Sequence, residues 1–319
     1  MLVIMRGFGI VDVLALLTAA GWLGKLTLPY HQAVRVRNAF LLRRGRPEDF
    51  QWTPATVPAD FHVERKRAPA EIEQAAQAAR SRVTGDWPLA LALVGLLVRH
   101  STREGDAIQA DLATTYAGIV SGAGYCSDHV RVYLAAASTV DIFCRQWAFS
   151  FDGFAGHGHT FVDVYDRQQA KWRFLDVHNN VYAVIAGTEE PLAALELRNA
   201  LLASPTSIEF RRAGPGRLGF DDFDKLLDYY RRGAPQWYLW WGNDVITRDS
   251  SGLRRGLQKI SRRLAHAVGS ALDLPRLVVI VSEQNEAEIA RMESLRRNII
   301  RAVTLIVILV TLFGVQLAW

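Results

Sequence analysis

The C-terminal end of this 319-residue chain is a run without a single charged residue, from Ala302 to Trp319. A helix rises about 1.5 Å per residue, so this run, extended by Ile299 and Ile300, roughly spans the ~30 Å hydrocarbon core of a bilayer. We therefore expect residues 299–319 to form a transmembrane helix. The rest of the chain has to be arranged around that anchor.

A second apolar segment lies at the other end of the chain, from Gly7 to Gly24. It contains Asp12, and an acidic residue at the centre of a membrane helix costs about 2.5 to 3.5 kcal/mol. Because Asp12 lies off centre, we expect residues 1–29 to hold another transmembrane helix. The alternative is a cleaved secretory signal with Arg6 as its basic region, although no clear Ala-x-Ala cleavage site follows.

Basic residues flank the inner ends of both apolar segments. They are Lys25, Arg35, Arg37, Arg43, Arg44 and Arg46 after the first segment, and Arg291, Arg296, Arg297 and Arg301 before the last. Because positively charged flanks tend to stay in the cytoplasm, this distribution predicts an inner-membrane protein whose middle part is cytoplasmic. A periplasmic middle part is the alternative, since the rule weakens for a long intervening domain.

Residues suited to catalysis are concentrated in the middle of the chain, beginning with a cysteine. Cys126 follows Gly122 and Gly124 and precedes a run compatible with a helix, so we expect it in the first turn of that helix. The dipole and unpaired N–H groups of a helix N-terminus stabilise a thiolate and can also hold an oxyanion. Cys126 is therefore a candidate nucleophile, whereas Cys144, in an apolar run, is expected to be a buried structural residue.

A predicted β-hairpin follows this cysteine. In its first strand the β-branched residues share the side that faces a core, which leaves His159 on the opposite side, facing a cleft. Asp176 closes the second strand, Trp172 to Val177, so His159 and Asp176 can be neighbours across two antiparallel strands. A thiol nucleophile needs a base within hydrogen-bond reach and a third group that orients the base. The three residues could supply all of these parts.

The three pieces together resemble the transglutaminase-like (papain-like) cysteine enzymes. The matching positions, all within residues 85–185, are Gly124 and Cys126, then Gly158, His159 and Phe161, then Trp172, Leu175 and Asp176. The resemblance implies a catalytic triad in which Cys126 is the nucleophile, His159 the base and Asp176 the residue that orients it. Thr160 is a mild departure from the pattern, and the side chain that completes the oxyanion hole is not identified, with Tyr116 or Tyr125 as candidates.

The expected fold is α+β, with a papain-like or transglutaminase-like core in which a helical half packs on an antiparallel sheet. The expected function is that of a membrane-anchored cysteine enzyme that cleaves or transfers an acyl group at an amide or ester bond, through an acyl-thioester on Cys126. Water as the acceptor would make it a peptidase or amidase, and an amine would make it a transglutaminase-type acyltransferase. We expect a protein or peptide-like amide as substrate and no cofactor.

Two other functions fit the same residues. The first is a catalytically inactive transglutaminase-like scaffold in the membrane, which binds a partner protein. The second is a metal site built from His157, His159, Asp176 and His178, because a His-x-His sequence on a strand places both rings on one face.

Two later stretches have patterns typical of a membrane surface. In Leu253–Leu272, apolar residues recur at spacings of three and four, and basic residues from Arg254 to His266 occupy the other faces. This pattern predicts an amphipathic helix that lies on anionic lipid. The aromatic stretch Trp237–Trp241 is either a second segment at the membrane surface or part of a packed core. No base-reading motif accompanies the basic residues, so we expect no nucleic-acid partner.

The predicted organisation has five parts. They are a transmembrane helix in 1–29, a basic juxtamembrane segment and linker in 30–69, the transglutaminase-like domain in 70–250, an amphipathic helix and connector in 251–298, and a transmembrane helix in 299–319. Four prolines between residues 45 and 69 predict an extended linker along the domain surface. Helices are predicted at Ala70–Arg82, Leu89–Val98, Glu189–Ala203 and Phe220–Tyr230, and Leu277–Val281 is either a strand or part of the last helix.

Overall fold

The computed structural model describes residues 2–28, 33–99, 106–108, 110–216, 219–220, 222–249 and 275–318. Its fold is α+β, which confirms the expected class, and it contains a six-stranded sheet and a two-stranded sheet. The predicted amphipathic helix Leu253–Leu272, with its Arg254–His266 basic stretch, lies outside the described residues.

The main sheet has the strand order β1-β8-β7-β2-β3-β4, and β5 pairs with β6 in the small sheet. Strands β1 and β8 run parallel, whereas the other neighbouring strands are antiparallel, so the main sheet is mixed. The strands are β1 Leu42–Gly45, β2 Cys144–Ser150, β3 Gly158–Asp166, β4 Lys171–Leu175, β5 Val181–Ile185, β6 Ile208–Arg212, β7 Trp237–Trp240 and β8 Leu277–Ile280.

The helices are α1 Leu2–Thr27, α2 Ala33–Leu41, α3 Ala70–Arg80, α4 Asp86–Val98, α5 Leu112–Val120, α6 Cys126–Thr139, α7 Ala194–Ala203, α8 Phe223–Gly233, α9 Val245–Asp249 and α12 Glu286–Ala318. Helix α7 begins later than the predicted Glu189, because Pro191 pairs with Val184 in an isolated β-bridge. The stretch left open at Leu277 is a strand, β8, that lies between β1 and β7.

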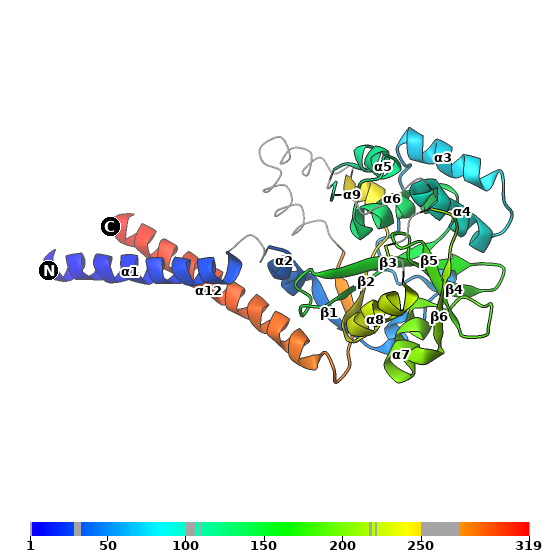
Figure 1. Cartoon of the computed structure of the whole chain (residues 1–319). Coiled ribbons are helices and arrows are strands. Elements are labelled where there is room, and N and C mark those ends of the chain that lie inside the picture. Colours follow the sequence, from blue (N-terminus) through cyan, green and yellow to red (C-terminus); the bar gives the residue numbers. More distant parts are fainter. Residues whose placement is uncertain are drawn as a thin grey trace.

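Helices cover both faces of the central strands (Figure 1). Helices α3 to α6 pack on one face, and α7 and α8 pack on the other. Along β3, Val162 and Val164 join the first core as the alternation predicts, and Phe161 points into the second. The side of the strand expected to line an open cleft is therefore itself buried, because α8 covers it.

The segment predicted to be a surface linker is instead part of the domain. Its aromatic residues Phe50, Trp52 and Phe61 are buried in the second core. Pro47 and Pro54 begin short 3-10 turns there, so the prolines bend the chain and direct aromatic rings inward. Proline content alone indicates a break in regular structure and not where the neighbouring side chains point.

The aromatic stretch Trp237–Trp241 lies in the interior, and its interpretation as a membrane-surface segment is wrong. Strand β7 sits between β2 and β8, and Trp237 and Trp241 are only 0% and 5% exposed. The ring of Trp237 packs against Phe161 with a centroid separation of 4.8 Å. Tryptophan density is equally typical of a large core and of a membrane interface, so only burial decides between them.

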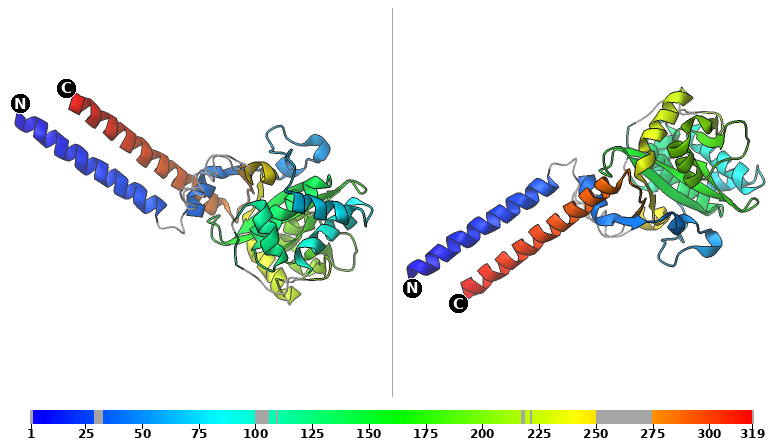
Figure 2. Two further views of the ribbon diagram at one scale, coloured as in Figure 1. Left: turned by 90° about the horizontal axis from the view of Figure 1, so that it is seen from above. Right: turned by 90° about the horizontal axis from the view of Figure 1, so that it is seen from below.

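A helical stem projects from the domain (Figures 1 and 2). Among the described residues, α12 is the one helix identified as long and apolar enough to cross a membrane. Helix α1 packs along it in the opposite direction, so both chain ends lie at the far tip of the stem. The parallel pairing of β1 with β8 joins the segments that lead into α1 and α12. Arg44 on β1 also forms ion pairs with Glu286 and Glu293 on α12, each at 2.8 Å.

Candidate active site

Cys126 is the first residue of α6, at the turn where the sequence places it. Gly122 and Gly124 precede it with φ angles of +95° and +102°, which residues with a side chain rarely adopt. The carboxylate of Asp128 accepts the Tyr125 N–H at 3.1 Å and holds the start of the helix. Cys126 is partly exposed. The N–H groups of Asp128 and His129 donate to the Tyr125 carbonyl, whereas a helix offers no internal acceptor for its first N–H groups, here those of Cys126 and Ser127.

The hairpin brings His159 and Asp176 into contact. His159 begins the buried part of β3, and Asp176 is the first residue after β4, so the antiparallel pairing of the two strands puts both at one end of the sheet. The Nε2 atom of His159 lies 2.7 Å from Oδ2 of Asp176. The side chains are 3% and 0% exposed, so water does not compete for this contact.

Cys126 lies near this imidazole, because its thiol is among the groups that raise the pKa of His159. Nε2 is engaged with the carboxylate, which leaves Nδ1 as the ring nitrogen available to the sulfur. The three predicted residues therefore lie near one another: His159 is bonded to Asp176 and is electrostatically coupled to Cys126. Nucleophilic catalysis by a thiol requires a base near the sulfur and a group that orients the base.

The charges of this cluster are coupled. Burial opposes a charge on His159, but Asp176 and Cys126 outweigh it and raise the pKa of the imidazole to about 10. Burial also opposes a charge on Asp176, yet the imidazole and hydrogen bonds from Tyr230 and Asn179 lower the pKa of this carboxyl to about 2. Near neutral pH, His159 and Asp176 therefore form an imidazolium–carboxylate pair.

Two further residues hold the carboxylate, and both were missed from the sequence. Tyr230 on α8 donates its hydroxyl to Oδ2 of Asp176 at 2.7 Å, and Asn179 donates its side-chain amide to the same oxygen at 2.5 Å. The Asn179 N–H also donates to Oδ1 at 3.1 Å. The polar side chain of Asn179, only three residues after Asp176, was a signal that could have identified it as a partner of the carboxylate. No local sequence pattern indicates that Tyr230 has this role.

The histidines proposed as metal ligands do not form a metal site. His157 is exposed on the β2–β3 loop, whereas the buried His178 has its Nδ1 3.5 Å from Nδ1 of His129. Across the described part of the chain, no three His, Cys, Asp or Glu side chains are grouped closely enough to hold a metal ion. The prediction that His157 and His159 share one face of a strand is wrong, because the strand begins at Gly158 and His157 still belongs to the loop.

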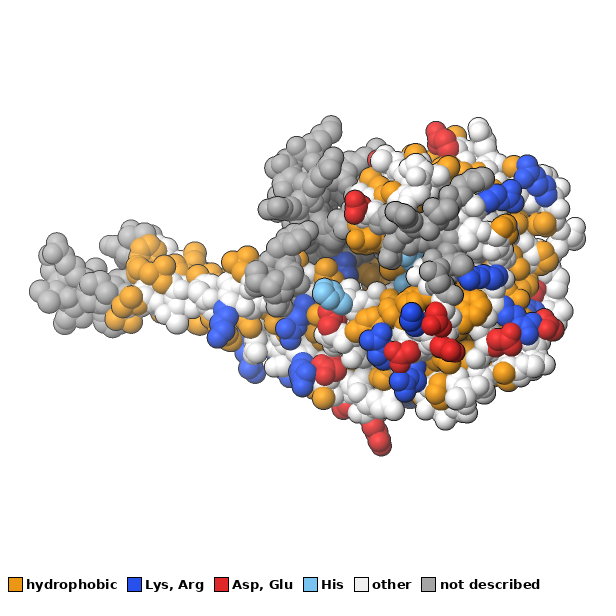
Figure 3. Space-filling model, viewed as in Figure 1, with side chains coloured by type: hydrophobic (Ala, Val, Ile, Leu, Met, Phe, Trp, Pro, Cys, Tyr) orange, Lys and Arg blue, Asp and Glu red, His pale blue; other side chains and the backbone are white. Residues whose placement is uncertain are grey.

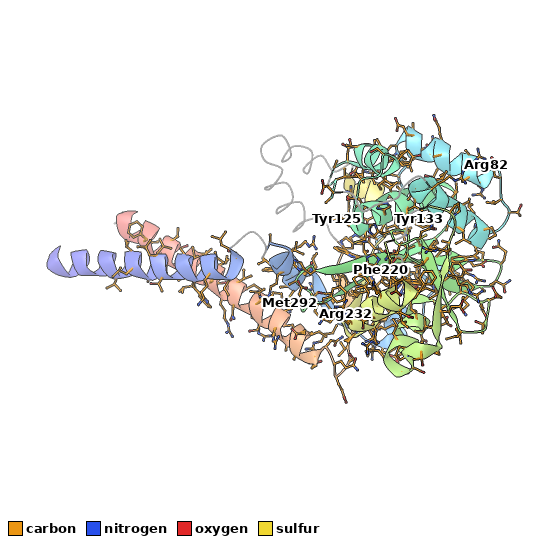
Figure 4. All side chains as sticks on the ribbon, viewed as in Figure 1. Arg82, Tyr125, Tyr133, Phe220, Arg232 and Met292 are labelled. Atoms are coloured by element: carbon orange, nitrogen blue, oxygen red, sulfur yellow. The ribbon has the colours of Figure 1, made fainter. Side chains whose placement is uncertain are left out.

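The two tyrosines considered for the oxyanion hole lie in different places. Tyr125 immediately precedes Cys126, and its side chain is 46% exposed on the face shown in Figure 4. Tyr116 lies on α5 and packs against the first core. Burial raises the pKa of the Tyr116 hydroxyl. Only Tyr125 is therefore adjacent to the thiol along the chain.

Comparison of the chain with protein-family models, with curated proteins and with solved structures found no match. The geometry around Cys126 is thus the observation on which a functional proposal rests.

Proposed function

We propose that this protein is a membrane-anchored cysteine enzyme of the transglutaminase-like type, acting on an amide or ester bond of a protein or peptide-like substrate. One observation carries the proposal: the buried contact of 2.7 Å between His159 and Asp176, with the Cys126 thiol near enough to raise the pKa of the imidazole. A protonated imidazole beside a thiol favours the nucleophilic thiolate, and a helix N-terminus adds to this effect.

The proposed reaction begins with attack of the thiolate on the substrate carbonyl carbon. The C–S bond forms and the π electrons of the carbonyl move to oxygen, where N–H groups of the first turn of α6 can stabilise the charge. When the oxyanion collapses, the C–N or C–O bond breaks, and the leaving group takes a proton from His159. The products of this step are an acyl-thioester, a free amine or alcohol, and a neutral imidazole.

The second half of the reaction releases the acyl group. Water or an amine attacks the thioester carbon and gives its proton to His159, and the thiolate departs. Asp176 stays ionised throughout and keeps the ring in place. The acceptor decides between a peptidase or amidase and a transglutaminase-type acyltransferase, and both outcomes use the same three residues.

The proposed setting is the inner membrane, crossed by α1 and α12, with the domain on the cytoplasmic side. The basic residues at the inner ends of both helices support this orientation. The stretch from Arg254 to His266 remains a predicted contact with anionic lipid, and a membrane protein partner remains a further prediction.

Selective alkylation of Cys126 tests the proposal on the full chain in detergent. We expect iodoacetamide to react at about pH 6 at least ten times faster than with glutathione, because an activated cysteine is thiolate where an ordinary thiol with a pKa near 8.5 is not. His159→Ala should remove this advantage. Cys144 is a built-in control, because burial raises the pKa of its thiol far above the ordinary value and shields it from the reagent.

The same labelling separates the alternatives. An alkylation rate that is unchanged by His159→Ala would contradict the enzyme proposal and favour the scaffold that only binds a partner. A membrane-impermeant maleimide should label Cys126 only after the cells are permeabilised if the domain is cytoplasmic. Labelling once the outer membrane alone is opened would show a periplasmic domain.

A further inference from the structure

A row of aromatic rings lies directly beside the imidazole of the candidate site. It consists of Phe151, Phe220 and Tyr229, which we call the aromatic ledge. Its members come from the end of β2, the segment before α8, and α8 itself. The Tyr229 ring is 5.7 Å from the His159 ring, and it lies 5.0 Å from Phe151 and 5.1 Å from Phe220.

Strand register explains why Phe151 belongs to this site. Phe149 pairs with His159 across β2 and β3, so the two side chains are on the same side of the sheet. Phe151 is two residues further along and continues the same side. The Phe151 N–H donates to the carbonyl of His157 at 2.8 Å, which ties this residue to the segment just before His159.

The ledge is open to solvent, unlike the aromatic core beneath it. Phe151 is 38% exposed, and Phe220 and Tyr229 are half-buried, whereas Phe149 is 1% exposed. The guanidinium of Arg232 lies 5.6 Å from the Phe151 ring centroid and fixes the ring from one side. Hydrophobic side chains gather over α8 on the face shown in Figure 3, and Figure 4 places Phe220 and Arg232 on that face.

We propose that the aromatic ledge binds an aromatic or large aliphatic side chain of the acyl donor, next to the carbonyl that Cys126 attacks. Partly exposed aromatic rings offer both apolar area and favourable ring contacts to such a group. A charged or small residue at the same position would gain neither. This inference rests on the proposed function and specifies the substrate class of the same site.

A pair of reagents that differ only in the side chain beside the reactive carbon tests the inference. N-acetyl-phenylalanine and N-acetyl-alanine chloromethyl ketones both alkylate thiols, and their rates are divided by their rates with glutathione. We expect the full chain in detergent to prefer the phenylalanine reagent by about tenfold or more, which is typical of a hydrophobic subsite. Phe151→Ala should lower this preference, taken as the ratio of the two rates on the same variant, to less than about threefold.

Two further variants make the result specific. Phe40→Ala is a matched control, because Phe40 on α2 has the same exposed fraction of 38% as Phe151 and lies in the stem-proximal helix. It should keep the full preference. Phe151→Tyr retains the ring and should also keep the preference, even if removal of the ring in Phe151→Ala disturbs folding.

The outcomes distinguish this inference from the proposed function. Equal normalised rates for the two reagents, or a preference that survives Phe151→Ala, would overturn the ledge while His159-dependent iodoacetamide labelling still supports the enzyme. Loss of the dependence on His159 would instead remove the proposed function, and the ledge would lose its basis with it.

Discussion

Tyr230 donates its hydroxyl to the Asp176 carboxylate over 2.7 Å, although 54 residues separate the two in the chain. Both side chains are completely buried. Helix α8 therefore contributes a residue that supports the charge pair built by the hairpin. Because its hydroxyl is bonded to the carboxylate, we regard Tyr230 as a positioning residue that acts through Asp176.

Replacing Tyr230 with phenylalanine should weaken this positioning. The variant removes one of the hydrogen bonds that lower the pKa of Asp176, so that pKa should rise and the acidic limb of Cys126 alkylation should move to higher pH. The free energy of unfolding, measured in urea, should fall by about 1–3 kcal/mol, as expected for loss of a hydrogen bond to a charged group. Phe50→Leu, in the same core, is the control: it should lower stability without moving the pH profile. An unmoved profile in Tyr230→Phe would refute the positioning role.

The stability of the protein should depend on the charge pair in a defined pH window. The His159 pKa is raised from 6.5 to about 10, so the folded state holds an extra proton and its stabilisation is complete below pH 6.5 and lost as the pH rises through 10. The Asp176 pKa is lowered from 3.8 to about 2, so its stabilisation is present above pH 3.8 and lost as the pH falls through 2.

Thermal unfolding in detergent across this pH range checks the expectation. From pH 6.5 to 10 the stability of the wild type, relative to His159→Gln, should fall by at most about 1.4 kcal/mol per pH unit, the limit for one proton. Parallel curves for the two proteins would show that His159 carries no extra proton in the folded state.

A second buried ion pair, between Arg145 on β2 and Asp163 on β3, should affect the stability of the fold and not the reactivity of Cys126. Asp163 accepts hydrogen bonds from Arg145 at 2.7 Å, from the Trp147 indole at 2.9 Å and from the Ala194 N–H at 2.8 Å. Asp163→Ala leaves a buried guanidinium without its partner and should cost about 3–5 kcal/mol of unfolding free energy. Glu190→Ala removes a partly exposed ion pair with Lys171 and should cost about 1 kcal/mol or less. Similar losses of unfolding free energy in the two variants would show that the buried pair contributes no more than this one.

The turn before Cys126 should tolerate only glycine at position 124. An alanine there would adopt a φ of +102° and place its Cβ 3.2 Å from Ile119, so Gly124→Ala should cost about 1–3 kcal/mol and slow alkylation of Cys126. Gly95→Ala is the matched control, because Gly95 is inside α4 with nothing within 4 Å of the added methyl group. That change should stabilise the helix by about 0.5–1 kcal/mol. If urea unfolding showed Gly124→Ala to be more stable than Gly95→Ala, the turn at Gly124 would not require glycine.

Features encoded over short distances in the chain were predictable. The glycine turn before Cys126, the two strands of the hairpin and the uncharged C-terminal run each depend on neighbouring residues, whose backbone preferences and periodicity show in the sequence. The hairpin also determines that His159 and Asp176 meet, because a short turn leaves the strands no other register. These local patterns were sufficient to name the candidate residues and to pair His159 with Asp176.

The tertiary structure decided everything that depends on which distant segments pair. Three features follow from the order of strands and from α8 covering the second face of the sheet: the burial of Trp52 and Trp237, the contact of Tyr230 with Asp176, and the packing of Tyr229 between Phe151 and the imidazole. Apolar and aromatic residues are equally compatible with a core, a membrane surface or a binding ledge. Burial of a side chain is a property of the assembled fold, and no window of sequence contains the partners that produce it.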